Sequence, residues 1–143
     1  MIKQISLFLE NKKGRLAHVC RVMGQEGINI RALSIADTTD FGVLRLIVDD
    51  PVKAEAKLKE RGFLVSITEV VAIKVDDNPG GLSVALDLLE KADVSVEYMY
   101  AFLGKCGDQA MVILRLSDNL KGVNTLLESK EIELMQESEA YNI

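Results

Sequence analysis

Two short loops contain residue types that could hold a charged small molecule. Residues 11–16 read NKKGRL and residues 77–82 read DNPGGL, so in both a glycine stands two positions before a leucine, where an apolar stretch ends and an amphipathic one begins. If each glycine leads into a helix, the unpaired N–H groups of the first helical turn would attract a carboxylate or a phosphate. The alternative is a tight turn in which the glycine only supplies a positive φ.

The charges beside the two loops differ in sign. Lys12, Lys13 and Arg15 make the first loop basic, whereas Asp76 and Asp77 make the second loop acidic, which suits an ammonium group. A site that offers both charges would suit a zwitterion such as a free amino acid.

The other reactive side chains do not form a catalytic or metal-binding pattern. His18 is the only histidine, and it stands two positions from Cys20 in a helical segment, where the two side chains point in different directions. Cys106 lies far away in the sequence, and the pair Asp49-Asp50 is explained by a helix cap. We therefore expect no enzyme activity, no metal and no cofactor, and we expect both cysteines to be buried free thiols.

The chain repeats itself at a spacing of 66 residues, which places Gly14 on Gly80. An apolar stripe typical of an amphipathic helix follows each glycine in the same register: Leu16, Val19, Cys20 and Met23 in the first copy, and Leu82, Ala85, Leu86 and Leu89 in the second. After a loop of different length the offset becomes 68, so that Glu60 falls on Glu128. Since the order of elements is also kept, the chain is a duplicated structural unit.

Each unit has the pattern of strand, helix, strand, strand, helix, strand. In the first unit we expect these elements at residues 2–10, 15–26, 28–37, 43–49, 51–61 and 64–68, with a turn at 38–42. In the second we expect them at 70–75, 80–92, 94–103, 109–116, 118–129 and 132–138, with a turn at 104–108. The predicted fold class is α+β, with two ferredoxin-like βαββαβ units (1–69 and 70–143) packed together. Each unit is an antiparallel sheet with two helices on one face, and Glu69 or its neighbours form a short linker.

Composition excludes several classes of protein. The 143 residues are 48% hydrophobic and 27% charged, as in a folded globular protein. A net charge of −5 with 5% aromatic residues is unsuited to nucleic-acid binding, because phosphate contacts need a basic face. No apolar run is as long as a membrane span and the N-terminus alternates like a strand, so we expect a cytoplasmic protein without membrane contact.

The stretch 11–34, NKKGRLAHVCRVMGQEGINIRALS, resembles the signature of ACT domains, small ferredoxin-like regulatory modules that bind amino acids. Their typical pattern is a strand, Asn/Asp-x-Pro-Gly-x-Leu, a helix, and a strand that starts with Asn-Ile. The second copy has the proline form of the loop, DNPGGL, whereas the first copy has Lys13 at the proline position. The first copy keeps Asn-Ile at the strand start, where the second has Ser-Val. The likeness covers nearly the whole chain, as two tandem copies.

This resemblance implies a paired arrangement and a place for the ligand. ACT units pair side by side through the strand after the first helix, which would give one eight-stranded sheet with four helices on one face. The ligand would lie between the first loop of one unit and the second strand of the other. Carried over to this chain, the binding residues are Asn11, Gly14, Arg15 and Leu16 with Asn29 and Ile30, and Asn78, Gly80, Gly81 and Leu82 with Ser95 and Val96.

Within such a site, the loop N–H groups would hold the ligand's carboxylate, and Asn11 or Asn29 would hold its amine or a polar side chain. Ser95 lacks the amide of Asn29, so either one or two sites per chain are compatible with the resemblance. On the same strand, Tyr98, Tyr100 and Phe102 share one face by alternation. They would either wall a pocket for a ring or form ordinary core against the small residues of the first copy.

Two functions agree with these observations. The first is a non-catalytic sensor, monomeric or homodimeric, that binds a free amino acid or a related small acid at the interface of its ACT-like units. The second is a regulatory or assembly subunit of an amino-acid-metabolism enzyme, acting through protein contact. An exposed apolar sheet face would favour the second.

Overall fold

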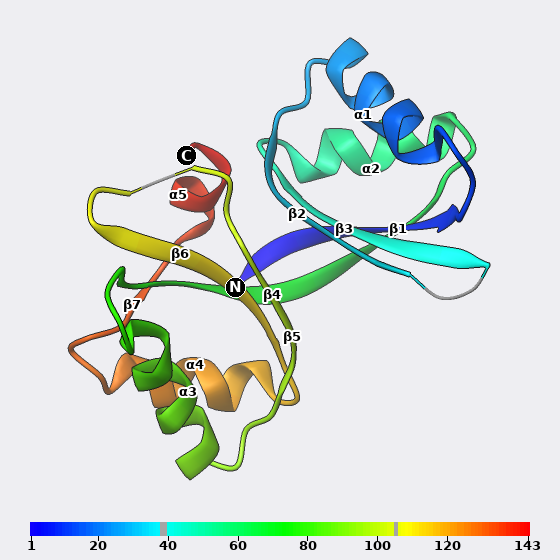
Figure 1. The fold of residues 1–143 in the computed structure, drawn as a ribbon. Coiled ribbons are helices and arrows are strands. Elements are labelled where there is room, and N and C mark those ends of the chain that lie inside the picture. Colours follow the sequence, from blue (N-terminus) through cyan, green and yellow to red (C-terminus); the bar gives the residue numbers. More distant parts are fainter. Residues whose placement is uncertain (38–39, 105) are drawn as a thin grey trace.

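The chain folds into two similar halves, and the computed structural model describes residues 1–37, 40–104 and 106–143. The first half contains β1 (Ile2–Glu10), α1 (Arg15–Gln25), β2 (Ile30–Asp37), β3 (Phe41–Val48) and α2 (Pro51–Glu60). A long β4 (Leu64–Asp76) leads into the second half, with α3 (Gly81–Lys91), β5 (Val96–Ala101), β6 (Gln109–Leu116), α4 (Asn119–Leu127), β7 (Glu133–Leu134) and α5 (Glu137–Tyr141) (Figure 1). The predicted turns at 38–42 and 104–108 include residues 38, 39 and 105, which lie outside the described residues. None of the described helices is both long and apolar enough to cross a membrane.

One antiparallel sheet runs through both halves in the order β2-β3-β1-β4-β6-β5, and the short β7 also pairs with β4. β4 belongs to both halves, because residues 64–70 pair with β1 and residues 71–76 pair with β6. Each half has the ferredoxin-like strand order, so the predicted α+β class of two βαββαβ units is confirmed. Glu69 does not form a linker but lies inside β4, and the described residues therefore form seven strands instead of eight.

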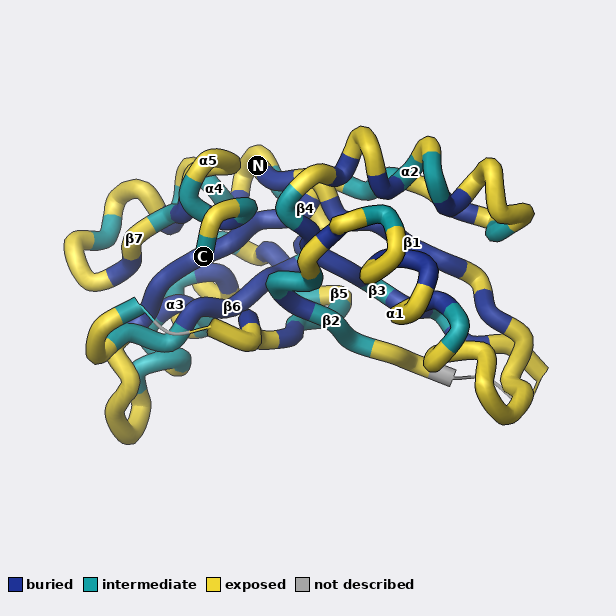
Figure 2. The backbone as a smooth tube through the Cα atoms, turned by 90° about the horizontal axis from the view of Figure 1, so that it is seen from above, coloured by how far each residue is buried: buried dark blue, intermediate teal, exposed yellow. Residues whose placement is uncertain are grey.

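The four long helices lie on one face of this sheet, as predicted. Along β4, the odd-numbered Val65, Val71 and Ile73 pack beneath the helices, whereas the even-numbered Val70 and Ala72 point to the opposite face. The sheet curls so strongly that α1 and α2 lie at one end of the molecule and α3 and α4 at the other (Figure 1). Each helix pair covers its own apolar core, and the buried strands run between them (Figure 2).

Equivalent aspartate residues start the second helix of each half. The side chain of Asp50 accepts a hydrogen bond from the Lys53 backbone N–H at 3.0 Å, and Pro51 follows it at the first helical position. Asp118 accepts from the Lys121 backbone N–H at the same distance. Asp50 is the N-cap expected from the sequence. Asp118, which was predicted to lie within the helix, is its counterpart at the second repeat offset.

A third apolar cluster, the inner cluster, lies on the sheet face opposite the helices and joins the two halves. It contains Ile2, Ala32, Ile47, Val70, Ala72, Tyr100, Phe102, Met111, Ile113, Met135 and Ala140. The fully buried Gln4 borders it and accepts a hydrogen bond from the Tyr100 hydroxyl at 2.7 Å. The same amide donates to the Tyr98 hydroxyl at 2.9 Å and to Ser6 Oγ at 3.0 Å. The aromatic row of β5 therefore forms core and holds the first half through Gln4.

Replacing Tyr100 with phenylalanine is expected to destabilise the protein by about 1.5 kcal/mol, because the side-chain carbonyl of the buried Gln4 loses its donor. Burial raises the pKa of Tyr100, so this hydroxyl stays protonated as a donor. Urea unfolding checks the value. Tyr141→Phe is the matched control: its hydroxyl accepts from the Lys3 backbone N–H at 2.8 Å near the surface, and its loss should cost about 0.5 kcal/mol. Equal losses in the two variants would contradict the role given to Gln4.

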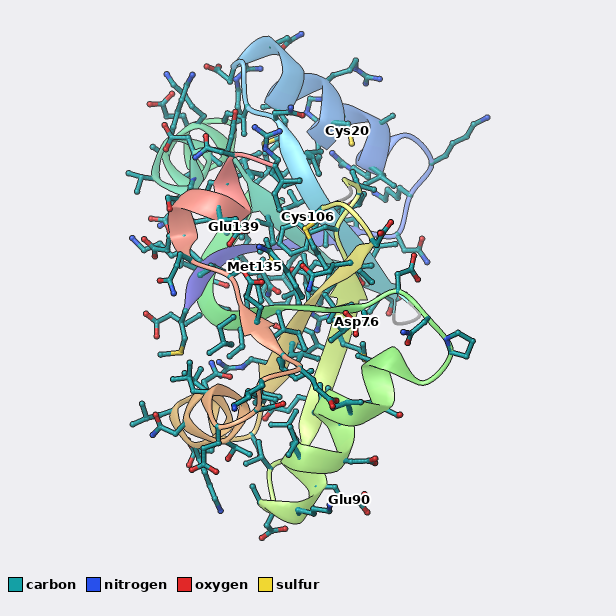
Figure 3. All side chains as sticks on the ribbon, turned by 90° about the vertical axis from the view of Figure 1, so that its left-hand side faces the viewer. Cys20, Asp76, Glu90, Cys106, Met135 and Glu139 are labelled. Atoms are coloured by element: carbon teal, nitrogen blue, oxygen red, sulfur yellow. The ribbon has the colours of Figure 1, made fainter. Side chains whose placement is uncertain are left out.

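The C-terminal segment differs most from the sequence-based expectation. A strand was predicted over residues 132–138, but β7 has two residues and α5 follows it. Between them the Met135 backbone N–H donates to the Ala72 carbonyl at 2.8 Å, and Met135 and Ala140 enter the inner cluster. Figure 3 looks onto this segment, with Met135 and Glu139 labelled. The segment therefore covers the inner face of the second half.

Two basic side chains hold this segment in place. Lys74, only 5% exposed, donates from Nζ to Glu133 Oε1 at 2.9 Å and also pairs with Glu139. Its hydrogen bonds to Glu139 and Glu133 raise the pKa of Lys74 in spite of its burial. Arg31 of β2 donates from Nε to the Tyr141 carbonyl at 3.0 Å and from Nη1 to the Ile143 carbonyl. The segment is thus attached to both halves.

Candidate functional site

The two glycine loops have the geometry that their sequences predict. Gly14 has φ +85° and immediately precedes α1, and Gly80 has φ +84° and immediately precedes α3. Neither helix has a side-chain N-cap or an acidic residue in its first turn. Both helix N-termini therefore present backbone N–H groups and positive potential without an internal anion.

The first loop borders a small cavity, the first-loop hollow, of about 150 Å³. Of the predicted residues, Asn11, Arg15 and Leu16 line it, together with Leu9, Glu10, Lys12, Ile35 and Gly42. Its position is fixed because the Asn11 backbone N–H donates to the Asp40 carbonyl at 3.0 Å, which ties the loop to the start of β3. All of this lining comes from the first half.

Charges of both signs meet in the first-loop hollow. Glu10 Oε2 lies 2.9 Å from Lys12 Nζ and 3.6 Å from Arg15 Nη2. The hydrogen bond and charge of Lys12, and the charge of Arg15, hold the pKa of Glu10 below its ordinary value. The hollow thus places a carboxylate and a guanidinium side by side at a helix N-terminus, a combination complementary to a zwitterion.

The second loop borders the second-loop hollow, of about 300 Å³. Asn78, Gly80 and Gly81 line it as predicted, together with Asp76, Pro79, Val84 and Glu131. Gly81 is required there, since a Cβ at this position would lie 1.9 Å from the Asp76 carbonyl oxygen. The predicted Leu82 packs into the core of the second half instead. With two carboxylates and no cation in its lining, this hollow is less suited to a ligand carboxylate.

The predicted strand starts lie away from both loop hollows. The Asn29 backbone N–H donates to Asp49 Oδ1 at 2.9 Å, at the end of the sheet opposite the first loop, and Ile30 packs on the first core. Ser95 and Val96 line a separate surface hollow at the end of α3. The Ser95 backbone N–H donates to Ser117 Oγ at 3.0 Å, which is the counterpart of the Asn29 contact.

A seam between the halves exists, but it is short. Ala32 of β2 forms an isolated antiparallel bridge with Phe102, and the Leu103 backbone N–H donates to the Arg31 carbonyl at 2.9 Å. The start of β2 therefore lies beside the end of β5. Neither loop hollow has a lining residue from the other half, so a site across this seam stays a prediction.

The remaining reactive side chains are dispersed. The rings of His18 and Phe63 lie 5.5 Å apart, and the free thiols of Cys20 and Cys106 belong to α1 and to the β5–β6 connection (Figure 3). The prediction that both thiols are buried is wrong, because Cys20 lies on the exposed side of α1 and Cys106 is only partly buried. Within residues 1–37, 40–104 and 106–143, no three His, Cys, Asp or Glu side chains are close enough to hold a metal ion. Sequence reasoning missed the buried Lys74 and Gln4. Lys74 could have been found as the lone charged residue of the apolar run VVAIKV, whereas Gln4 stands beside Lys3 and near Ser6 and carries no such signal.

Comparisons with known proteins agree with this geometry. The family model for an ACT domain pair matches residues 1–143. The crystal structure of protein BT0572 from Bacteroides thetaiotaomicron is similar, with a TM-score of 0.92 and 43% sequence identity over 99% of this chain and 96% of that one. The ligand-free regulatory subunit of aspartate kinase from Thermus thermophilus has a TM-score of 0.64 and 13% identity over 90% of this chain and 92% of that one. The latter likeness shows the fold alone. No curated protein matches the chain significantly.

Proposed function

The chain belongs to the ACT domain pair family of regulatory ligand-binding proteins, and we propose that it binds a free amino acid or a related small acid as a non-catalytic sensor. The observation that carries this proposal is the first-loop hollow. There Glu10 and Arg15 offer opposite charges beside the open N-terminus of α1. The helix terminus and Arg15 would receive the ligand's carboxylate, and Glu10 and Asn11 its ammonium group.

The existing ion pairs support such an exchange. Glu10, Lys12 and Arg15 are all about half exposed or more, so their mutual attraction is weakened by solvent. A zwitterion can replace these pairs with similar pairs of its own and add backbone hydrogen bonds. The apolar side chains of Leu16 and Ile35 would then contact the ligand's side chain.

We further propose one strong site per chain. The second-loop hollow keeps the glycine-capped helix, but its charged lining residues, Asp76 and Glu131, would repel a ligand carboxylate. The first-loop hollow has Lys12 and Arg15 in its lining instead, and this difference favours the loop of the first half.

A thermal-shift scan against the twenty amino acids and several small acids tests this function. A ligand at about 100 times its dissociation constant should add roughly 2.7 kcal/mol, a shift of a few degrees. Gly14→Val and Gly80→Val are matched variants, because both place a β-branched residue at the same left-handed φ. We expect Gly14→Val to abolish the shift and Gly80→Val to keep it. A flat scan, or a folded Gly14→Val protein with unchanged affinity, would contradict the proposal.

The alternative function is a regulatory or assembly subunit that binds an enzyme, and one observation favours it. The inner face of the first half is uncovered where the C-terminal segment covers that of the second. Phe8 and Leu64, paired across β1 and β4, are 48% and 68% exposed there. Such a face is typical of a partner surface. Two results together would favour this alternative over the sensor. An enzyme would co-purify with the chain but not with its Phe8→Ser variant, and no amino acid would shift the melting temperature.

A further inference from the structure

A second cavity, the end hollow, opens at the end of the first-half sheet where β1 ends and β4 begins. Its volume is about 360 Å³. It shares Leu9, Glu10 and Arg15 with the first-loop hollow, and these residues separate the two openings. Its other walls come from α1, from Phe41 at the start of β3 and from the loop that follows α2. Three segments that are distant in the sequence therefore converge on one cavity of a size common for small-molecule sites.

The end hollow is positively charged. Its lining contains the guanidinium groups of Arg15 and Arg61 against the single carboxylate of Glu10. Arg61 Nη2 lies 3.2 Å from Glu26 Oε1, and Arg15 Nη2 lies 3.6 Å from Glu10 Oε2. Both arginine side chains are nearly half exposed, so these pairs are weak and both groups can take an incoming anion.

Flat apolar side chains form the rest of the cavity. The rings of His18 and Phe63 lie 5.5 Å apart at an angle of 40° and together make one wall. Phe8 and Leu64 border the cavity as the last paired residues of β1 and β4, and their side chains, about half or more exposed, lie on the inner face of the sheet. A ligand ring that covered these surfaces would remove apolar area from water and gain aromatic contacts.

The second half shows that the fold does not require these side chains. α1 and α3 begin at equivalent positions, which places Arg15 on Gly81 and His18 on Val84. At the repeat offset that also relates the caps Asp50 and Asp118, Arg61 falls on Ser129. The Phe8–Leu64 strand pair has the Lys74–Glu133 pair as its counterpart. The same architecture is thus built without the two arginines, the histidine or the apolar pair, so packing alone does not explain them.

We propose that the end hollow binds a small organic anion that combines one aromatic ring with a carboxylate. Arg15 and Arg61 hold the carboxylate, and His18 and Phe63 pack against the ring. This site shares Arg15 with the amino-acid site of the first-loop hollow, so the two ligands compete for that guanidinium, but binding here needs no amino acid at the first loop.

Isothermal titration with three probes tests the proposal on the intact chain. 3-Phenylpropanoate carries the ring and the carboxylate, hexanoate carries the carboxylate without a ring, and phenylalanine adds an ammonium group. We expect 3-phenylpropanoate to bind at millimolar concentration or below and hexanoate to bind about tenfold more weakly. Phenylalanine should bind no better than 3-phenylpropanoate, because the carboxylate of Glu10 in this lining is paired with Lys12 and Arg15. If phenylalanine bound more tightly than 3-phenylpropanoate and Gly14→Val abolished that binding, the separation of the two sites would be overturned.

The variants take residues that the second half already has, so each is expected to fold. Arg61→Ser should weaken 3-phenylpropanoate binding by about tenfold or more, and His18→Val by about threefold. Lys91→Gln removes one positive charge from the end of α3 and is the matched control that should leave affinity unchanged. Equal losses in Arg61→Ser and Lys91→Gln would reduce the effect to net charge and overturn the site. The proposed site would also be overturned if the Arg61→Ser and His18→Val variants bound 3-phenylpropanoate as tightly as the unchanged protein.

The two proposals can fail separately. Loss of amino-acid binding with retained 3-phenylpropanoate binding would contradict the sensor function and leave the end hollow in place. Absence of 3-phenylpropanoate binding at millimolar concentration, with an amino acid still bound, would overturn only the inference on the end hollow.

Discussion

Replacing Glu133 and Glu139 together with glutamine is expected to destabilise the protein by about 3 kcal/mol, because it leaves the charge of Lys74 buried without an anion. The Lys74 side chain is almost completely buried, so water cannot take over the role of the two carboxylates. The same change weakens the attachment of the C-terminal segment, since Lys74 is one of the two basic side chains that hold it. Urea unfolding measures the loss.

Two further results separate this ion cluster from general charge effects. Glu137→Gln, on the same helix α5, removes a carboxylate that does not contact Lys74 and should change stability by less than about 0.5 kcal/mol. The raised pKa of Lys74 also sets the pH range over which its ion pairs stabilise the protein. The contribution of the raised Lys74 pKa to the free energy of unfolding should be complete below the pKa of an unfolded lysine, about 10.4. It should be lost only as the pH rises above that value. A double variant no less stable than Glu137→Gln would show that the segment is held in another way.

Gly81→Ala is expected to destabilise the protein by about 3 kcal/mol, because its Cβ would lie 1.9 Å from the Asp76 carbonyl oxygen. Backbone atoms cannot move aside as a flexible side chain can, so the whole second loop would have to shift. Thermal unfolding should show a clear fall in the melting temperature. Under the one-site proposal, ligand binding at the first loop should survive in the folded fraction.

Gly24→Ala is the matched control for this prediction. Gly24 lies in α1, and a Cβ there would have no atom within 4 Å. Since alanine favours a helix over glycine, this variant should be stabilised by about 0.5 kcal/mol. Melting temperatures that move in the same direction in both variants would contradict the close approach assigned to Gly81.

The repeated elements were predictable because local patterns encode them. The amphipathic stripes after Gly14 and Gly80 and the cap Asp50 depend on residues within one helix. The structure confirms the cap and buries Val19, Met23, Ala85 and Leu89, but Leu16 and Cys20 of the first predicted stripe are exposed. The positive φ of both loop glycines follows in the same way from the strand-to-helix turn.

Glu69 shows where local patterns fail. A charged residue between two apolar runs is typical of a connection, yet here its side chain points to solvent while β4 continues past it. Its carbonyl accepts hydrogen bonds from Arg115 Nη1 at 2.8 Å and Asn119 Nδ2 at 2.9 Å, both from the second half. These contacts join residues about fifty positions apart, so the sequence alone could not indicate them.

Prediction of the C-terminal segment and of the candidate sites from the sequence was limited by the same cause. The alternation after Ile132 favours a strand, but Lys74 and the inner cluster select a helix that covers the sheet. For the sites, loop conformation was local and correctly predicted. The lining of the end hollow joins His18, Arg61 and Phe8 through tertiary packing that periodicity does not reveal.

An NMR titration of the isotope-labelled protein tests the central claim most directly. Each amino acid that shifts the melting temperature is added while the backbone amide signals are followed. The sensor account predicts saturable shifts at Asn11, Gly14, Arg15 and Leu16, with much smaller ones at Asn78, Gly80 and Gly81. Shifts confined to other parts of the molecule, or no saturable shifts with any amino acid, would contradict ligand binding at the first loop.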